Sequence, residues 1–270
     1  MITEEGSDDD HGDSDNEDEF TYIEDDSASI TFSKYGWSMC SNFRGIARQW
    51  HKIAQLLPDH MWQALKIGEE CDRRVTDKFR GFFRLDPVSN EQQELQKDNL
   101  SLKCDVQKLR YETDQALRRQ FRHYGVDMDS LSTPVFKMVY AENGAVAQPV
   151  HFDLESNADK AYGVLLYCNG PTTSTCVPTK TAAEMAPLHW KATIATSNEV
   201  QVSRKIKTKR NEFFRSFNVD AGDALFFRAN VAHYGPACND SETRYVIYAL
   251  FSPDDNPNQD DKQVLPLSGL

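Results

Sequence analysis

The part of the chain after Pro134 limits the possible folds most, because it consists of short runs rich in β-branched and aromatic residues. The runs span residues 135–140, 162–167, 212–219, 224–228 and 245–251. Turn-forming sequences rich in Gly, Asn and Asp separate them. Several short strands without intervening helices predict an antiparallel sandwich or barrel.

The region before Pro134 has a different periodicity. Apolar residues recur at spacings of three and four from about residue 43 to residue 83, which predicts helix interrupted at Pro58. A polar segment over 91–123 also predicts helix. Leu95, Leu102 and Leu109 are seven residues apart and hint at a coiled coil, but the alternate heptad positions are mostly polar. We therefore expect a helix that packs on the main domain.

The acidic charge is concentrated at the N-terminus. Residues 1–26 contain 13 of the 42 acidic residues and no lysine or arginine, so the remaining acids nearly balance the 30 bases. The net charge of −12 therefore neither identifies nor excludes a partner for the folded part. We expect a disordered acidic tail over 1–29, a mainly helical region over 30–130, a β domain over 131–254 and a C-terminal tail over 255–270.

Cysteine spacing and targeting signals indicate the compartment. The six cysteines form no CxxC pair and no zinc-finger spacing. The first residues lack the basic and apolar regions of a secretory signal, and no apolar run approaches the length of a membrane span. We expect an intracellular protein, cytoplasmic or nuclear, with reduced thiols and no membrane association.

Two histidines and one aspartate suggest a metal site. His151 and Asp153 are two residues apart, and in a strand such residues point to the same face. His233, after a later β-rich run, adds a second imidazole. Two histidines and one carboxylate on one face leave three positions open, as non-haem Fe(II) requires. The His-x-Asp pattern alone is a weak signal, and a lone histidine is more often structural, so the prediction depends on the combination.

Arg244 begins the apolar, alternating run 245–251 and lies 11 residues after His233. A cation that opens a core strand needs an anionic partner, because burying it unpaired is costly. Its planar guanidinium is shaped to hold a carboxylate through two parallel hydrogen bonds. Two interpretations remain, a bound carboxylate ligand or a salt bridge at the rim.

These motifs occur in an order that resembles the 2-oxoglutarate/Fe(II)-dependent oxygenase superfamily, and most of all its prolyl-hydroxylase-like branch. The similar stretch runs from about residue 135 to residue 252. The matching positions are Tyr140 with Gly144, His151 with Asp153, Tyr167 with Asn169, Thr175 with Pro178, the strand Gly222-Asp223-Ala224-Leu225-Phe226, His233 and Arg244.

The resemblance implies a fold and a set of roles. The fold would be α+β, with a double-stranded β-helix (a jelly-roll, cupin-like core) and N-terminal supporting helices. Iron would be ligated by His151, Asp153 and His233, and the distal carboxylate of 2-oxoglutarate by Arg244. Tyr140 and Tyr167 resemble the tyrosines that help to hold the keto acid, and Tyr248 shares a strand face with Arg244. The alternative for the tyrosines is packing in the core.

The implied activity is that of a dioxygenase dependent on Fe(II), 2-oxoglutarate and dioxygen. It would hydroxylate or oxidatively demethylate a protein, a nucleic acid or a small molecule, with release of succinate and CO2. Two alternatives remain: a catalytically inactive β-helix binding module, and a nucleic-acid- or protein-interaction protein that uses the basic segment 204–210.

Overall fold

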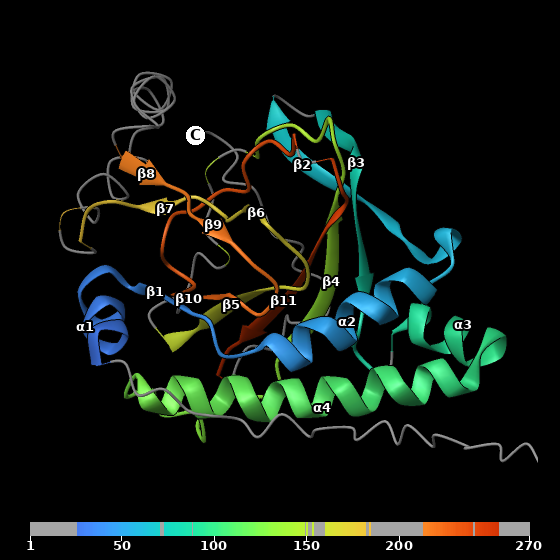
Figure 1. Ribbon diagram of the computed structural model, residues 1–270, viewed down its shortest axis with the longest axis horizontal. Helices are drawn as coiled ribbons and strands as arrows, with labels where there is room; N and C mark the ends of the chain where they lie inside the picture. Colours follow the sequence, from blue (N-terminus) through green and yellow to red (C-terminus); the bar gives the residue numbers. More distant parts are fainter. Residues whose placement is uncertain are drawn as a thin grey trace, which may run out of the picture.

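The computed structural model of the chain describes residues 26–70, 73–87, 89–148, 150, 153, 160–181, 184, 213–239 and 241–253. A large sheet occupies the middle of the molecule (Figure 1). Helices α2 and α4 run along one face of this sheet, and two small sheets lie over the other. The predicted acidic tail up to residue 25, His151, the basic segment 204–210 and the C-terminal tail 255–270 lie outside the described residues.

The large sheet has seven strands in the order β1-β10-β5-β11-β4-β3-β2, and every neighbouring pair is antiparallel. The predicted antiparallel arrangement is confirmed. The strands are β1 (Trp37–Cys40), β2 (Gln63–Glu70), β3 (Arg73–Arg84), β4 (Val135–Ala141), β5 (Tyr162–Tyr167), β10 (Ala224–Arg228) and β11 (Arg244–Phe251).

The two small sheets are made of two-residue strands. One pairs β6 (Thr172–Thr173) with β9 (Asn218–Val219), and the other pairs β7 (Val177–Pro178) with β8 (Phe214–Arg215). The run predicted as one strand over 212–219 is therefore two strands. They separate at Phe217, where the backbone N–H donates to the Ser174 hydroxyl at 2.9 Å and the Ser174 N–H donates to the Phe217 carbonyl.

The helices are α1 (Asp26–Tyr35), α2 (Arg44–Leu56), the 3-10 turn η1 (Asp59–Met61), α3 (Asn90–Asp98) and α4 (Leu100–His123). None of the helices described is long and apolar enough to cross a membrane. The predicted helix over 91–123 is interrupted at Asn99, whose side chain caps α4 by accepting from the Leu102 N–H at 3.0 Å.

Helix α4 packs on the large sheet, as expected from its weak heptad pattern. Its buried stripe includes Leu102, Leu109 and Phe121, which belong to the same apolar cluster as the sheet residue Ile247. A buried hydrogen bond from the indole N–H of Trp50 to the Thr113 hydroxyl, 2.9 Å long, fixes α4 against α2. The packed helix is confirmed in place of a coiled coil.

Two expectations for the N-terminal half are wrong. The helical pattern predicted up to residue 83 stops at α2, and residues 63–84 form the β2–β3 hairpin, which extends the large sheet. In β3, Phe82 and Phe83 are partners of Val139 and Met138 in β4, and this tertiary pairing overrides the local periodicity. The disordered tail predicted to residue 29 also overlaps helix, because α1 begins at Asp26.

Helix α1 covers the sheet at the β1 edge through one aromatic side chain. Phe32 is 2% exposed and stacks on Tyr124 with ring centroids 5.0 Å apart. We expect Phe32→Ala to lower the free energy of unfolding by about 3–5 kcal/mol, because it leaves a cavity in the main core. Urea unfolding of the full chain measures this. Ile30→Ala in the same helix is the control: Ile30 is 66% exposed, and its loss should change stability by no more than about 0.5 kcal/mol.

Candidate active site

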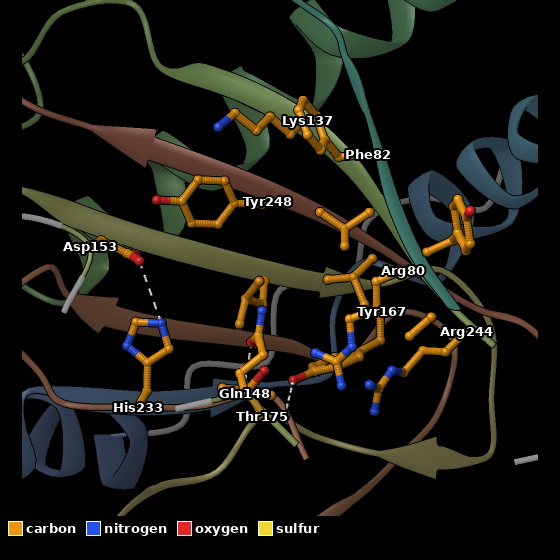
Figure 2. Close-up of a pocket in the computed structure, with 16 residues that line it drawn as sticks. Arg80, Phe82, Lys137, Gln148, Asp153, Tyr167, Thr175, His233, Arg244 and Tyr248 are labelled. Atoms are coloured by element: carbon orange, nitrogen blue, oxygen red, sulfur yellow. Dashed lines mark hydrogen bonds and ion pairs between the residues drawn. The ribbon is translucent and has the colours of Figure 1, made fainter. Parts of the chain in front are cut away.

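A pocket opens on the face of the large sheet that lies toward the small sheets, and strands β3, β4, β5 and β11 supply much of its lining (Figure 2). The register of these strands arranges the side chains in rows. In one row, Ala141 of β4 lies between Arg80 of β3 and Arg244 of β11. Four residues further along β11, Tyr248 is the partner of Lys137 in β4. The pocket thus has a row of arginines at one end and a Lys–Tyr pair toward the other.

Asp153 and His233 meet at one side of the pocket. The His233 Nε2 lies 3.5 Å from Asp153 Oδ1, and both side chains are nearly inaccessible (Figure 2). The His233 Nδ1 lies 3.0 Å from the Val231 carbonyl, which can only accept, so Nδ1 carries a proton. Burial lowers the pKa of His233 to about 4, and the imidazole is therefore neutral.

In this tautomer the Nε2 lone pair faces a carboxylate oxygen. Two electron-pair donors face each other at 3.5 Å, an arrangement that a cation between them stabilises. Nitrogen and oxygen donors of this kind suit Fe(II). Asp153 and His233 can thus supply two ligands to one metal ion, while the third predicted ligand, His151, is not among the described residues.

Tyr248 adds a hydroxyl to this side of the pocket. The residue is buried, and its side chain points toward the side where Asp153 lies (Figure 2). Burial and the charge of Asp153 raise the pKa of Tyr248 well above its usual range. The hydroxyl therefore keeps its proton beside the carboxylate. The predicted position of Tyr248, on the same strand face as Arg244, is the one observed.

Arg244 and Tyr167 lie together at another part of the pocket lining. Arg244 is 6% exposed and donates from Nη1 to the Thr173 carbonyl at 2.7 Å. No carboxylate in the part of the chain that the structure describes forms a salt bridge with it, so the alternative of a rim salt bridge finds no partner there. The Tyr167 hydroxyl accepts from the Thr175 N–H at 2.7 Å, which leaves its own proton available to donate. Burial raises the pKa of Tyr167, and the charge of Arg244 opposes this.

Tyr140 is placed differently from its predicted role. It borders the pocket, but its ring packs edge-on against Trp62 with centroids 5.1 Å apart and covers Gly81. Alternation along β4 puts Tyr140 on the face that carries Phe136 and Met138, which belong to the core beneath the helices. The contacts therefore support the packing alternative for Tyr140 and not a role in holding a keto acid.

No protein-family model matches the sequence, and no curated protein matches it. Solved structures do match. HygX from Streptomyces hygroscopicus, solved with nickel and 2-oxoglutarate bound, superposes with a TM-score of 0.54 at 12% identity, covering 86% of this chain and 88% of that one. The α-ketoglutarate-dependent carbocyclase SnoK from nogalamycin biosynthesis gives 0.52 at 11% identity, covering 91% and 94%. A prolyl hydroxylase from Trichoplax adhaerens gives 0.50 at 8% identity, covering 87% and 91%.

The chain has the fold of the 2-oxoglutarate-dependent oxygenases. The resemblance that the sequence motifs indicated is thereby confirmed at the level of the fold. The match covers 86–91% of the chain, so it extends beyond the stretch 135–252 in which the sequence carried motifs of this superfamily.

Three polar residues of the pocket lining were not predicted from the sequence. Arg80 is 3% exposed and donates from Nη2 to the carbonyls of Val146 and Pro236, at 2.9 and 2.6 Å. Gln148 accepts from the Gly235 N–H at 2.9 Å, which ties together the two loops that flank the site. Lys137 enters from the middle of β4. Alternation with Phe136 and Met138 places it on the face away from the core, but the same pattern is typical of a solvent-exposed lysine, so the sequence alone did not indicate a pocket.

The orientation of His233 depends on a glycine. The Phe227 ring packs on the His233 imidazole with centroids 4.7 Å apart, and Gly163 is its partner in β5. A Cβ at Gly163 would overlap the Phe227 ring.

We expect Gly163→Ala to lower the free energy of unfolding by about 1–3 kcal/mol, because the ring has to shift within a packed core. Thermal and urea unfolding measure the change. The matched control is Gly45→Ala in α2, where a Cβ meets nothing within 4 Å and stability should stay the same or rise by up to about 1 kcal/mol. Equal losses in both variants would contradict the steric explanation.

Proposed function

We propose that this chain is a dioxygenase dependent on Fe(II) and 2-oxoglutarate. The observation that carries the proposal is the neutral His233 Nε2 facing the Asp153 carboxylate across 3.5 Å, in the same pocket as Arg244. One part of the lining offers metal ligands and another offers a guanidinium without an acidic partner among the described residues. A molecule that both chelates a metal and carries a distant carboxylate fits such a pocket, and 2-oxoglutarate is such a molecule.

In this proposal His151, Asp153 and His233 hold the iron. Bound iron and 2-oxoglutarate supply the activation of dioxygen that hydroxylates or oxidatively demethylates a C–H-bearing substrate, with release of succinate and CO2. Arg244 pairs with the distal carboxylate of 2-oxoglutarate, and the Tyr167 hydroxyl donates to the same group. The backbone at Thr173 and Thr175 orients these two side chains before any ligand binds.

The double-stranded β-helix belongs to the same proposal. The seven-stranded sheet would form one side of the jelly roll, and the pairs β6–β9 and β7–β8 the other. The site then lies between the two sides, walled by apolar residues such as Val139, Leu165 and Val246. Such walls exclude water from an oxidising reaction. The substrate is a protein, a nucleic acid or a small molecule.

The alternative of an inactive binding module makes a different prediction about the metal. A module that had lost turnover would not need two electron-pair donors buried against each other. The interaction-protein alternative depends on residues 204–210, which the structure does not describe, and no described contact favours it. Metal binding would contradict the interaction-protein alternative, and release of succinate from 2-oxoglutarate would contradict the inactive module.

Removal of any one metal ligand should abolish the metal site. We expect His151→Ala, Asp153→Ala and His233→Ala each to lose the visible absorbance that the wild type develops with Fe(II) and 2-oxoglutarate under anaerobic conditions. Circular dichroism should show that the fold remains. His60→Ala is the control, because the His60 side chain is 58% exposed and lies outside the pocket. Absence of the absorbance in the wild type would overturn the proposal.

Arg244 should control affinity for the keto acid without affecting the metal. Arg244→Lys keeps the charge but loses the two-pronged geometry, so we expect weaker 2-oxoglutarate binding. Arg244→Gln should weaken it further, by about 2–5 kcal/mol, because the carboxylate is buried without a counter-charge. Calorimetric titration of metal-loaded protein measures both. Arg215→Gln, on an exposed arginine, is the control and should bind like the wild type. Equal affinities in Arg244→Gln and wild type would refute the assignment.

A further inference from the structure

The pocket contains a cation that the proposed cofactors do not use. Lys137 lies in the middle of β4 between Phe136 and Met138, which are fully buried beneath the helices. Strand alternation therefore sends the lysine side chain to the opposite face, into the pocket. Its Nζ lies 5.5 Å from the centroid of the Phe82 ring, and Figure 2 shows the two side chains next to each other in the pocket lining.

Within the described part of the chain, no carboxylate forms a salt bridge with Lys137; its only specific contact there is with the Phe82 ring. Burial lowers the pKa of Lys137, and the nearby charge of Arg84 lowers it further, while Asp153, Asp86 and Glu91 oppose this more weakly than burial acts. The ammonium is thus kept largely from water without an adjacent counter-ion. An anion bound in the pocket would satisfy it.

2-Oxoglutarate held by Arg244 does not supply that anion. Lys137 is the strand partner of Tyr248, four residues from Arg244 along β11. At a rise of about 3.3 Å per residue, the backbone positions of Tyr248 and Arg244 are roughly 13 Å apart along the strand. A keto acid whose far carboxylate is at Arg244 and whose near end is at the metal has no further carboxylate for Lys137.

The sum of the charges in the pocket also indicates that the proposed cofactors do not neutralise Lys137. The positive charge of Fe(II) and Arg244 together has the same magnitude as the negative charge of Asp153 and doubly charged 2-oxoglutarate. The four groups are therefore neutral in sum. Arg80 is a further cation, but it donates to two backbone carbonyls. Carbonyls are neutral, so Arg80 and Lys137 both remain as positive charges in the pocket. Arg80 is held by these two hydrogen bonds, whereas the Lys137 ammonium contacts only the Phe82 ring among the described residues and is available to a third molecule.

We propose that Lys137 binds the substrate, and that the substrate carries an anionic group, a carboxylate or a phosphate, which pairs with its ammonium. This inference rests on the proposed function. The substrate is then an organic anion whose charged group lies against the Lys137 ammonium, on the Tyr248 side of the pocket. Lys137 is a specificity-determining residue in this arrangement and takes no part in holding iron.

The test uses two simple anions, acetate and methyl phosphate, with the full-length protein loaded anaerobically with Fe(II) and 2-oxoglutarate. The paramagnetic iron broadens the methyl proton NMR signal of any probe bound beside it. We expect the wild type to broaden the signal of at least one probe, and the stronger effect identifies the carboxylate or the phosphate. Lys137→Met should reduce the broadening at least fivefold, and Lys137→Arg should retain most of it.

Arg84→Met is the matched control. Arg84 is the strand partner of Lys137 in β3 but does not line the pocket, so this variant removes an equal charge nearby and should change the broadening less than twofold. Equal broadening in wild type, Lys137→Met and Lys137→Arg, or no broadening in any of them, would overturn the inference. So would weaker 2-oxoglutarate affinity in Lys137→Met, which would assign the lysine to the co-substrate. Loss of the iron–keto-acid absorbance in the wild type would instead show that the proposed function had failed.

Discussion

The two-residue alternation of β11 is the constraint on which the rest of the molecule depends. This strand pairs with both β4 and β5 at the centre of the sheet. Ile247 and Phe251 face the helices, whereas Arg244 and Tyr248 face the pocket. A slip of one residue would place the guanidinium in the apolar core and the aliphatic side chains in the site. Burial of Ile247 and Phe251 in the core and placement of Arg244 and Tyr248 in the pocket therefore require the same register of β11.

The helical layer stabilises that register from behind. The α4 residue Phe121 contacts the rings of Phe226 and Phe251, which come from two strands of the sheet. On the opposite face of β10, Phe227 contacts His233. Packing beneath the sheet thus fixes the position of a candidate metal ligand above it, with one strand between them. A site of this kind needs ligands fixed before the metal arrives.

The sequence alone predicted the strands whose pattern was purely local. Runs such as 162–167 and 224–228 alternate or are wholly apolar and are bounded by turns, so their period identifies them. The β2–β3 hairpin could not be found in this way, because its pairing partner is β4, far along the chain. Arg80 lies in β3, so its place in the pocket could not be predicted for the same reason. The direction of Tyr140 required knowledge of its strand parity and of Gly81, whose missing side chain makes room for the ring.

The electrostatics of the pocket explain why a molecule would bind there in one orientation only. Asp153 and the neutral His233 present electron pairs, which favour a metal and repel a bare carboxylate. Arg244 presents N–H donors near Tyr167, whose hydroxyl keeps its proton. In the proposed function, a chelating acid would bind with its far carboxylate at Arg244 and its near end at a metal held by Asp153 and His233. The Lys137 ammonium lies on the Tyr248 side of the pocket, away from the row that contains Arg244.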